Sequence, residues 1–228
     1  MKKSRLLAYS LVLVISSFSF SGCLSSKSLT KTVKSVISDD CKTIKPVTVG
    51  NIILKTDGLL KSDSAVTVEK VSSFFIPAIL VWGWENKLKC QINDNYFVNV
   101  LVDEINRQND EFQLGKFLAD RHLEINIESV PSVFEYEDNG FYYFAFFAYG
   151  YSSYEGIDPK DQRFQVSYRI LVGETELKKG VFTKYYNAPF KDGWASGSGL
   201  AKKYMKEVVN AYDNDCEQCI SEILDELY

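Results

Sequence analysis

The spacing of apolar residues near the C-terminus predicts one long amphipathic helix. Between residues 200 and 227, apolar side chains recur every three or four positions, and no Pro interrupts the segment. Such spacing places the apolar side chains on one stripe of a helix, which then packs on a core. The same spacing predicts a shorter helix over residues 97–105, with Asn93 and Asp94 placed to cap its start.

Alternating apolar and polar positions predict several strands. The segments with this pattern, or with a concentration of β-branched residues, are residues 46–54, 66–71, 122–128, 164–172 and 176–186. The last two flank the turn sequence Gly173-Glu174-Thr175, so they are expected to form a hairpin. Residues 122–128 alternate strictly, which is typical of a strand with one buried face.

Two segments contain no charged residue. Residues 74–84 are too few to span a membrane, and Pro77 argues against an uninterrupted helix. A buried strand that ends in a turn at Gly83 is favoured over a patch that contacts lipid or a partner protein. Residues 141–151 are the most aromatic stretch, so either both faces of this strand are covered or one face is a broad aromatic surface. An aromatic core beneath the helices is the favoured interpretation.

These elements predict an α+β fold. The expected architecture is an antiparallel or mixed sheet of about five or six strands with two helices packed on one face, the longer one at the C-terminus. Residues 43–228 are expected to form this single domain.

The N-terminus has the three parts of a secretory signal peptide. Lys2, Lys3 and Arg5 precede an apolar segment over residues 6–20, which is shorter than the roughly 20 residues that a membrane-spanning helix needs. Small residues then lead to Cys23. Residues 1–22 are therefore predicted to be a leader, and residues 23–42, rich in Ser, Thr and Lys, a tether. The spacing of apolar residues 29, 33 and 37 also allows a short helix there.

Phe20-Ser21-Gly22-Cys23 resembles the lipobox of bacterial lipoproteins, in which Leu usually occupies the first position. The resemblance implies cleavage before Cys23, diacylation of its thiol with fatty acids such as palmitate, and anchoring in a membrane. Two or three acyl chains anchor a protein durably. Leu24-Ser25 contains no acidic retention signal, and by similarity to enteric lipoproteins this implies the outer membrane of a bacterial envelope, on either its periplasmic or its outer side.

Composition narrows the classes of partner. The chain has 30 acidic and 26 basic residues, and three of the basic ones belong to the leader, so the cleaved chain carries a formal charge of −7. This balance argues against nucleic acid and against electrostatic adhesion to anionic lipid. Aromatic residues are unusually plentiful, with 14 Tyr and 15 Phe, and the apolar area and polar tip of Tyr and Trp suit contacts with glycan, lipid or protein.

The cysteines do not indicate a redox or metal site. Cys216 and Cys219 form a C-x-x-C within the long predicted helix, where both thiols fall on the apolar stripe, so they are interpreted as core residues. With Cys41 and Cys90 they make four cysteines in an exported chain, which allows up to two disulfides in three pairings. A zinc site of four thiolates is disfavoured in an oxidising compartment.

No residue is predicted to be catalytic, and no metal or cofactor is expected. His122 is the sole histidine, no nucleophile motif such as G-x-S-x-G is present, and the carboxylate pairs carry no flanking signature. The Gly-rich stretch 193–199 contains no lysine for phosphate. The candidate binding surface consists of aromatic residues that combine apolar area with a polar tip: Trp82, Trp84, Tyr149, Tyr151 and Tyr154.

The order of elements resembles small envelope lipoproteins of the transport-auxiliary and lipopolysaccharide-assembly type. In those proteins an Ala-Asp pair, here Ala119-Asp120, opens the strand after the first helix, and a strand meander and a long helix follow. The predicted function is a non-enzymatic, membrane-anchored lipoprotein that binds a partner protein or amphiphile in envelope assembly or transport. The alternatives are a hydrolase of envelope polymers that uses carboxylates, and a purely structural lipoprotein.

Overall fold

The computed structural model describes residues 24–37, 43–59, 62–77, 81–145, 148–160 and 162–227. Within this part of the chain the fold is α+β, as predicted, with four helices and eight strands. The elements in chain order are α2 (Ser26–Lys34), β1 (Ile52–Lys55), β2 (Val66–Pro77), β3 (Val81–Ile92), α3 (Asp94–Phe112), α4 (Leu114–Leu118), β4 (Arg121–Ser129), β5 (Val133–Ala145), β6 (Ala148–Asp158), β7 (Arg163–Val172), β8 (Thr175–Tyr185) and α5 (Gly197–Asp225).

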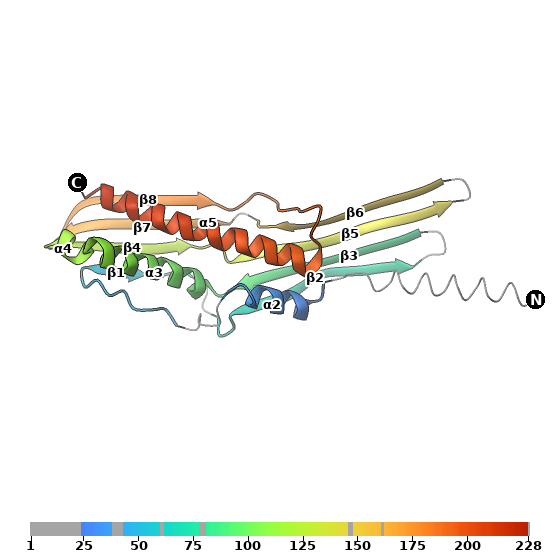
Figure 1. Ribbon diagram of the computed structural model, residues 1–228, viewed down its shortest axis with the longest axis horizontal. Helices are drawn as coiled ribbons and strands as arrows, with labels where there is room; N and C mark the ends of the chain where they lie inside the picture. Colours follow the sequence, from blue (N-terminus) through green and yellow to red (C-terminus); the bar gives the residue numbers. More distant parts are fainter. Residues whose placement is uncertain are drawn as a thin grey trace, which may run out of the picture.

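The strands form two sheets of four, in place of the single sheet of five or six expected from the sequence. One sheet has the order β1-β4-β7-β8 and the other the order β2-β3-β5-β6. Only the pairing of β1 with β4 is parallel among these strands. Figure 1 shows the sheets following one another along the molecule, with α5 lying across both, while β2, β3, β5 and β6 continue well beyond the helices.

The two predicted helices are confirmed and extended. Asn93 caps α3, since its side chain accepts a hydrogen bond from the backbone N–H of Asn95 at 3.0 Å. The apolar stripe of α5 is buried along its length, and Tyr212 packs edge-on against Phe97 of α3 with 4.9 Å between ring centroids. The helices thus form one layer over the two sheets.

Residues 24–37 belong to the folded domain and do not form a free tether. Leu29, Val33 and Ile37 recur at four-residue intervals and are buried, and Leu24 is only 6% exposed. Leu29 and Val33 lie on the buried side of α2, which packs against β2, β3 and α5. The domain therefore includes residues that precede its predicted start at residue 43, because this short stripe fills the layer beside α5. Cys23 and Cys41 lie outside the described residues.

The two uncharged segments each contribute to two strands. Residues 74–84 are divided between the end of β2 and the start of β3, so Gly83 lies inside a strand and the predicted turn there is wrong. Residues 141–151 are likewise divided between β5 and β6. The described residues of both segments are largely exposed, and among them neither the expected buried strand nor the expected aromatic core is present. Of the predicted strand 46–54, only its end lies in β1.

Candidate functional site

The ends of β2, β3, β5 and β6 form an extension that no described helix covers (Figure 1). We call this extension the distal arm and define it as residues 73–77, 81–84, 140–145 and 148–153. It is built from the two uncharged segments of the sequence, which the pairing of β3 with β5 brings side by side. Among the large apolar side chains of the molecule, those of the arm are unusually exposed, with Tyr149 at 76% and Phe75 at 59%.

One face of the arm continues the face that the helices cover. Residues that are paired across neighbouring strands point to the same side, and Trp84, Trp82 and Tyr142 follow in register from the buried Leu88 and Cys90. The other large side chains placed on this helix-side face by the register are Phe75, Phe144, Tyr149 and Tyr151. The rings of Trp82 and Tyr142 lie 5.3 Å apart.

The opposite face of the arm is also apolar. The register places Phe74, Ile76, Val81, Phe141 and Tyr143 on this back face. All five are at least 40% exposed. The ring of Tyr143 packs directly on the backbone of Gly150. A Cβ atom at position 150 would come within 1.9 Å of this ring, so the contact requires glycine. The arm is therefore an apolar element, and neither of its faces is covered by the described part of the chain.

A row of three polar residues separates the arm from the covered half of the sheet. Asn86, Asp138 and Glu155 are register partners on the helix-side face. The Trp84 indole N–H donates to Asp138 at 2.9 Å. Burial, together with the negative charge of Glu155, raises the pKa of the Asp138 carboxyl above its usual range, although the Trp84 bond opposes this. We call these three residues the polar row.

The polar row also fixes the starts of two helices. The buried Asn86 side chain donates to the backbone oxygen of Leu24 at 2.9 Å, immediately before α2. Glu155 accepts a hydrogen bond from the backbone N–H of Gly197, the first residue of α5. The hydroxyls of Ser28 and Ser198 lie 3.0 Å apart, so the two helix N-termini are side by side. Both helices thus start where the arm begins.

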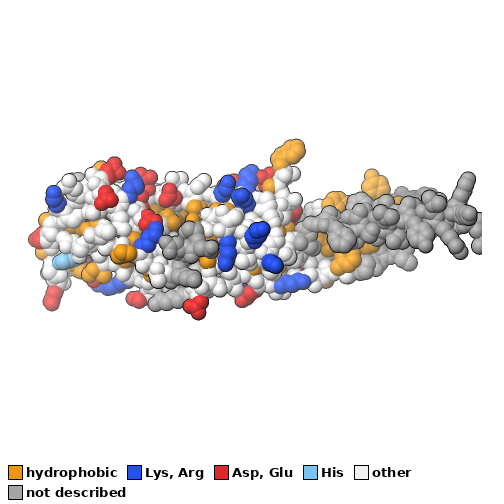
Figure 2. Space-filling view, turned by 60° about the horizontal axis from the view of Figure 1, so that its bottom comes forward, with side chains coloured by type: hydrophobic (Ala, Val, Ile, Leu, Met, Phe, Trp, Pro, Cys, Tyr) orange, Lys and Arg blue, Asp and Glu red, His pale blue; other side chains and the backbone are white. Residues whose placement is uncertain are grey.

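Several lysines lie on the two helices that start at the base of the arm. We call five exposed residues the lysine collar: Lys27, Lys31 and Lys34 of α2, and Lys202 and Lys206 of α5. None of the five forms an ion pair within the described part of the chain. From Glu207 onward α5 carries only acidic charges. Figure 2 shows Lys and Arg side chains collected beside the arm.

This segregation of charge is a feature that the composition conceals. The net negative charge argues against adhesion to anionic lipid, but it includes both the positively charged lysine collar and the acidic part of α5 from Glu207 onward. A signal was present in the sequence, because α2 contains three lysines and no acidic residue. Only the packing of α2 beside the start of α5 unites the two lysine groups.

The structure brings together four of the five residues of the predicted binding surface. Trp82, Trp84, Tyr149 and Tyr151 lie on the helix-side face, where the rings of Trp84 and Tyr151 are 6.5 Å apart. Tyr154 is on the back face, and the Lys191 ammonium lies 4.2 Å from its ring centroid. The five predicted residues do not include Phe75, Tyr142 and Phe144, although all three lie within the two uncharged segments.

The described cysteines are buried free thiols. Cys90, Cys216 and Cys219 are all 0% exposed and none of them is in a disulfide. Burial raises the pKa of the Cys90 and Cys219 thiols to about 12, and raises that of Cys216 as well. They are therefore neutral and poor nucleophiles. The described residues contain no cluster of His, Cys, Asp and Glu side chains that could hold a metal ion.

Most carboxylates of the pairs seen in the sequence are held by cations. Glu135 lies 3.0 Å from both Lys87 and Lys160. Glu124 is bonded by Arg169 and by Lys55, and these hydrogen bonds lower the pKa of its carboxyl. Such carboxylates are neutralised acceptors, without the raised pKa that suits a general acid.

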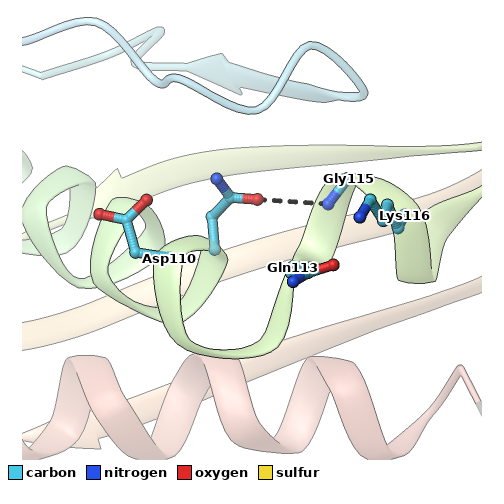
Figure 3. Close-up of a pocket in the computed structure, with 5 residues that line it drawn as sticks. Asp110, Gln113, Gly115 and Lys116 are labelled. Atoms are coloured by element: carbon cyan, nitrogen blue, oxygen red, sulfur yellow. Dashed lines mark hydrogen bonds between the residues drawn. The ribbon is translucent and has the colours of Figure 1, made fainter.

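The hollows of the surface lie away from the arm. One, of about 410 Å³, is lined by residues of the α3–α4 turn, and the side chains of Asp110, Gln113 and Lys116 are spread along it without converging (Figure 3). The backbone N–H of Gly115 donates to Asn109 at 3.3 Å and closes this turn. A second hollow of the same volume lies near Val130 and Gln162. His122 is exposed on β4, apart from both.

Comparison with known proteins gives no match to a family model, to a curated protein or to a solved structure. In the part of the chain that the structure describes, no helix has the length and apolar character needed to cross a membrane.

Proposed function

We propose that the protein is a non-enzymatic, membrane-anchored lipoprotein of a bacterial envelope, and that its distal arm binds the apolar part of an amphiphile. The observation that carries the proposal is the exposure of large apolar side chains on both faces of the arm. Contiguous exposed apolar patches are rare on soluble monomers and usually mark interaction sites.

An amphiphile suits this surface better than a globular partner protein. A globular partner covers one face of a sheet, whereas hydrocarbon chains can enclose both. The helix-side face is rich in Trp and Tyr, whose rings contribute apolar area while the indole N–H and the phenol O–H reach polar groups. Tyr151, for example, donates its hydroxyl proton to Ser153 at 2.6 Å and keeps its ring exposed.

The proposed lipid anchor is attached at the base of the arm. Leu24 is buried and its backbone oxygen is held by Asn86, so the position of the chain is fixed there. Cys23 directly precedes Leu24 in the sequence. Acyl chains on Cys23 would therefore hold the arm close to the bilayer.

The hydrolase alternative has no supporting observation. It needs a cleft with paired carboxylates of unequal pKa. Asp138 and Glu155 are the two carboxylates that most resemble such a pair. However, Asp138 is bonded to Trp84, and Glu155 accepts from Tyr136 at 2.7 Å and from Gly197.

The arm is tested by the fluorescence of its own tryptophans. In a Trp194→Phe variant, Trp82 and Trp84 are the only indoles left. Titration with dodecylphosphocholine below its critical micelle concentration should give a saturable blue shift. The double variant Phe75→Ser, Tyr151→Ser should weaken binding at least tenfold, which corresponds to about 1.4 kcal/mol.

A matched control comes from the other sheet. Leu177 and Val181 of β8 are as exposed as many arm residues, at 55% and 61%, but lie outside the arm. The variant Leu177→Ser, Val181→Ser should bind the detergent like the parent protein. Equal weakening by both double variants would contradict the proposal.

The anchor is tested separately by fractionation. A Cys23→Ser variant, exported behind a leader whose cleavage needs no cysteine, should be released from membranes by a high-salt wash, whereas the parent protein should stay bound. Retention of the variant after the wash would show that the thiol of Cys23 carries no anchor.

A further inference from the structure

Three features meet at the base of the arm. The arm projects from the polar row, the lysine collar surrounds its base, and the chain enters the domain there through Leu24. The acidic part of α5 lies at the other end of that helix (Figures 1 and 2). Along α5, positive charge near the arm is thus followed by negative charge away from it.

We propose that this end docks on the surface of an anionic lipid bilayer. The distal arm enters the interfacial layer, and the lysine collar contacts the lipid phosphates. This inference rests on the proposed function, because it identifies the amphiphile that the arm binds as membrane phospholipid. It adds a second attachment, which the protein's own side chains make and which selects for negatively charged lipid.

The composition of the arm fits the membrane interface. Trp and Tyr concentrate at the level of the lipid head groups, where their rings meet hydrocarbon and their polar atoms meet water. The helix-side face carries both of these residue types, and the back face carries Phe, Ile and Val. A bilayer surrounds an inserted element, so it can cover both faces of the arm together.

The lysine collar explains the preference for anionic lipid. Its five ammonium groups have no acidic partner among the described residues, so no ion pair must be broken before they meet phosphate. Lysines near an anionic surface each strengthen binding roughly fivefold, an effect that salt screens. The acidic part of α5 is repelled by the same surface. Attraction and repulsion therefore both orient the arm toward the membrane.

The open edges of the sheet limit the depth of insertion. β2 and β6 are the outermost strands of their sheet, so within the arm each has one row of backbone N–H and C=O groups without strand partners among the described residues. Such edges are not tolerated in the hydrocarbon core, where no water is present to bond them. The arm, at about six residues and ~20 Å per strand, is longer than the interfacial layer is deep. It should therefore lie obliquely in this layer.

The test measures binding of the chain to vesicles without its lipid. Cys23→Ser, Trp194→Phe protein is mixed with phosphatidylcholine vesicles that contain 30% phosphatidylglycerol, or none, and bound protein is measured by sedimentation. Brominated lipids report contact with Trp82 and Trp84 by quenching. We expect binding and quenching with the anionic vesicles, a loss of at least tenfold in binding to neutral ones, and release in high salt.

Matched lysine variants locate the charge effect. Lys31→Gln, Lys206→Gln removes two charges from the collar and should weaken binding to anionic vesicles at least tenfold. Lys116→Gln, Lys179→Gln removes two exposed lysines elsewhere and should change binding less than twofold. Circular dichroism checks that both variants fold.

Three results would overturn the inference. The first is equal binding to neutral and anionic vesicles, and the second is equal weakening by the two lysine variants. The third is concentration-dependent dimerisation in sedimentation velocity with a tryptophan blue shift in the absence of lipid, which would assign the arm to a second copy of the chain. If detergent monomers still bind the arm in any of these cases, the proposed function stands and only the bilayer inference fails.

Discussion

The covered half and the distal arm of the sheet β2-β3-β5-β6 are made by the same four strands, yet they present different surfaces. In the covered half, side chains alternate between a buried apolar face, with Leu88 and Tyr136, and a charged face, with Lys87 and Glu137. Beyond the polar row the strands no longer alternate between an apolar and a charged face. Both faces there are apolar and exposed. A strand can therefore be apolar on both faces without being buried.

The difference lies in what covers the strands. α2 and α5 start at the polar row, where Leu24 and Gly197 are hydrogen-bonded, and both extend away from the arm over the covered half, with α5 continuing over the other sheet. Apolar side chains in that half contribute to folding through burial, at roughly 25 cal/mol per Å². Those of the arm gain little from folding, so their role is expected in binding. The predictions below separate stability from binding in the two regions.

The largest expected effect is on stability in the covered half. Phe134 is 1% exposed and packs against Tyr204 with 5.0 Å between ring centroids. Phe134→Ala should lower the free energy of unfolding by about 3–5 kcal/mol. Tyr151→Ala in the arm should lower it by less than about 1 kcal/mol, because the side chain is already exposed. Urea unfolding measures both values. An equal decrease in the free energy of unfolding for the two variants would contradict the difference between the two regions.

The buried thiols should affect stability alone. The variant Cys216→Ala, Cys219→Ala leaves small cavities beneath α5 and should lower the free energy of unfolding by about 1–3 kcal/mol. Detergent binding by the arm should be unchanged, as measured by tryptophan fluorescence. Loss of binding in a variant that remains folded would show that these thiols take part in the function.

The polar row should control local order at the base of the arm. Asn86→Ala removes the donor to the Leu24 oxygen and leaves that oxygen unpaired, at a cost of about 1–3 kcal/mol. Hydrogen exchange should therefore become faster over residues 24–34, while α3 stays protected. Unchanged exchange in α2 would mean that Asn86 does not fix the start of the domain.

The smallest expected effect is on pH dependence. Burial raises the folded-state pKa of Asp138 above its unfolded value, so the stability associated with this group is fully present below the unfolded pKa and is lost as pH rises through the folded pKa. Asp138→Asn keeps an acceptor for Trp84 and removes this loss. The variant should melt at a higher temperature than the parent at pH 7 and at a similar temperature at pH 3. A gain that is equal at both pH values would contradict the assignment.

Local sequence patterns predicted the helices and strands better than they predicted how the strands pair and which residues are exposed. The spacing of apolar residues identified α5, α3 and the hairpin of β7 and β8, because each pattern reflects one buried stripe or face. The division into two sheets was missed, since the choice of strand partner depends on contacts far apart in the sequence. The exposure of residues 141–151 was missed for a related reason, because it depends on where α2 and α5 start.

The candidate site was predicted in part. Four aromatic residues of the predicted surface share one face of the arm, but Tyr154 does not, because it lies an odd number of positions from Tyr149 and Tyr151 along the same strand. The lysine collar was not predicted. Its two groups are more than 160 residues apart, and only the packing of α2 near the start of α5 joins them.

The central claim is that the arm, and not the sheet β1-β4-β7-β8, contacts lipid, and labelling of two matched tyrosines tests it most directly. Tyr149 of the arm and Tyr185 of β8 are 76% and 67% exposed. Each is replaced by Cys in a Cys23→Ser, Cys41→Ser background and coupled to an environment-sensitive fluorophore; the three buried thiols, with their raised pKa values, should not react. On addition of anionic vesicles, the account predicts a blue shift for the label at position 149 and none at position 185. Equal shifts at both positions, or a shift at position 185 alone, would contradict it.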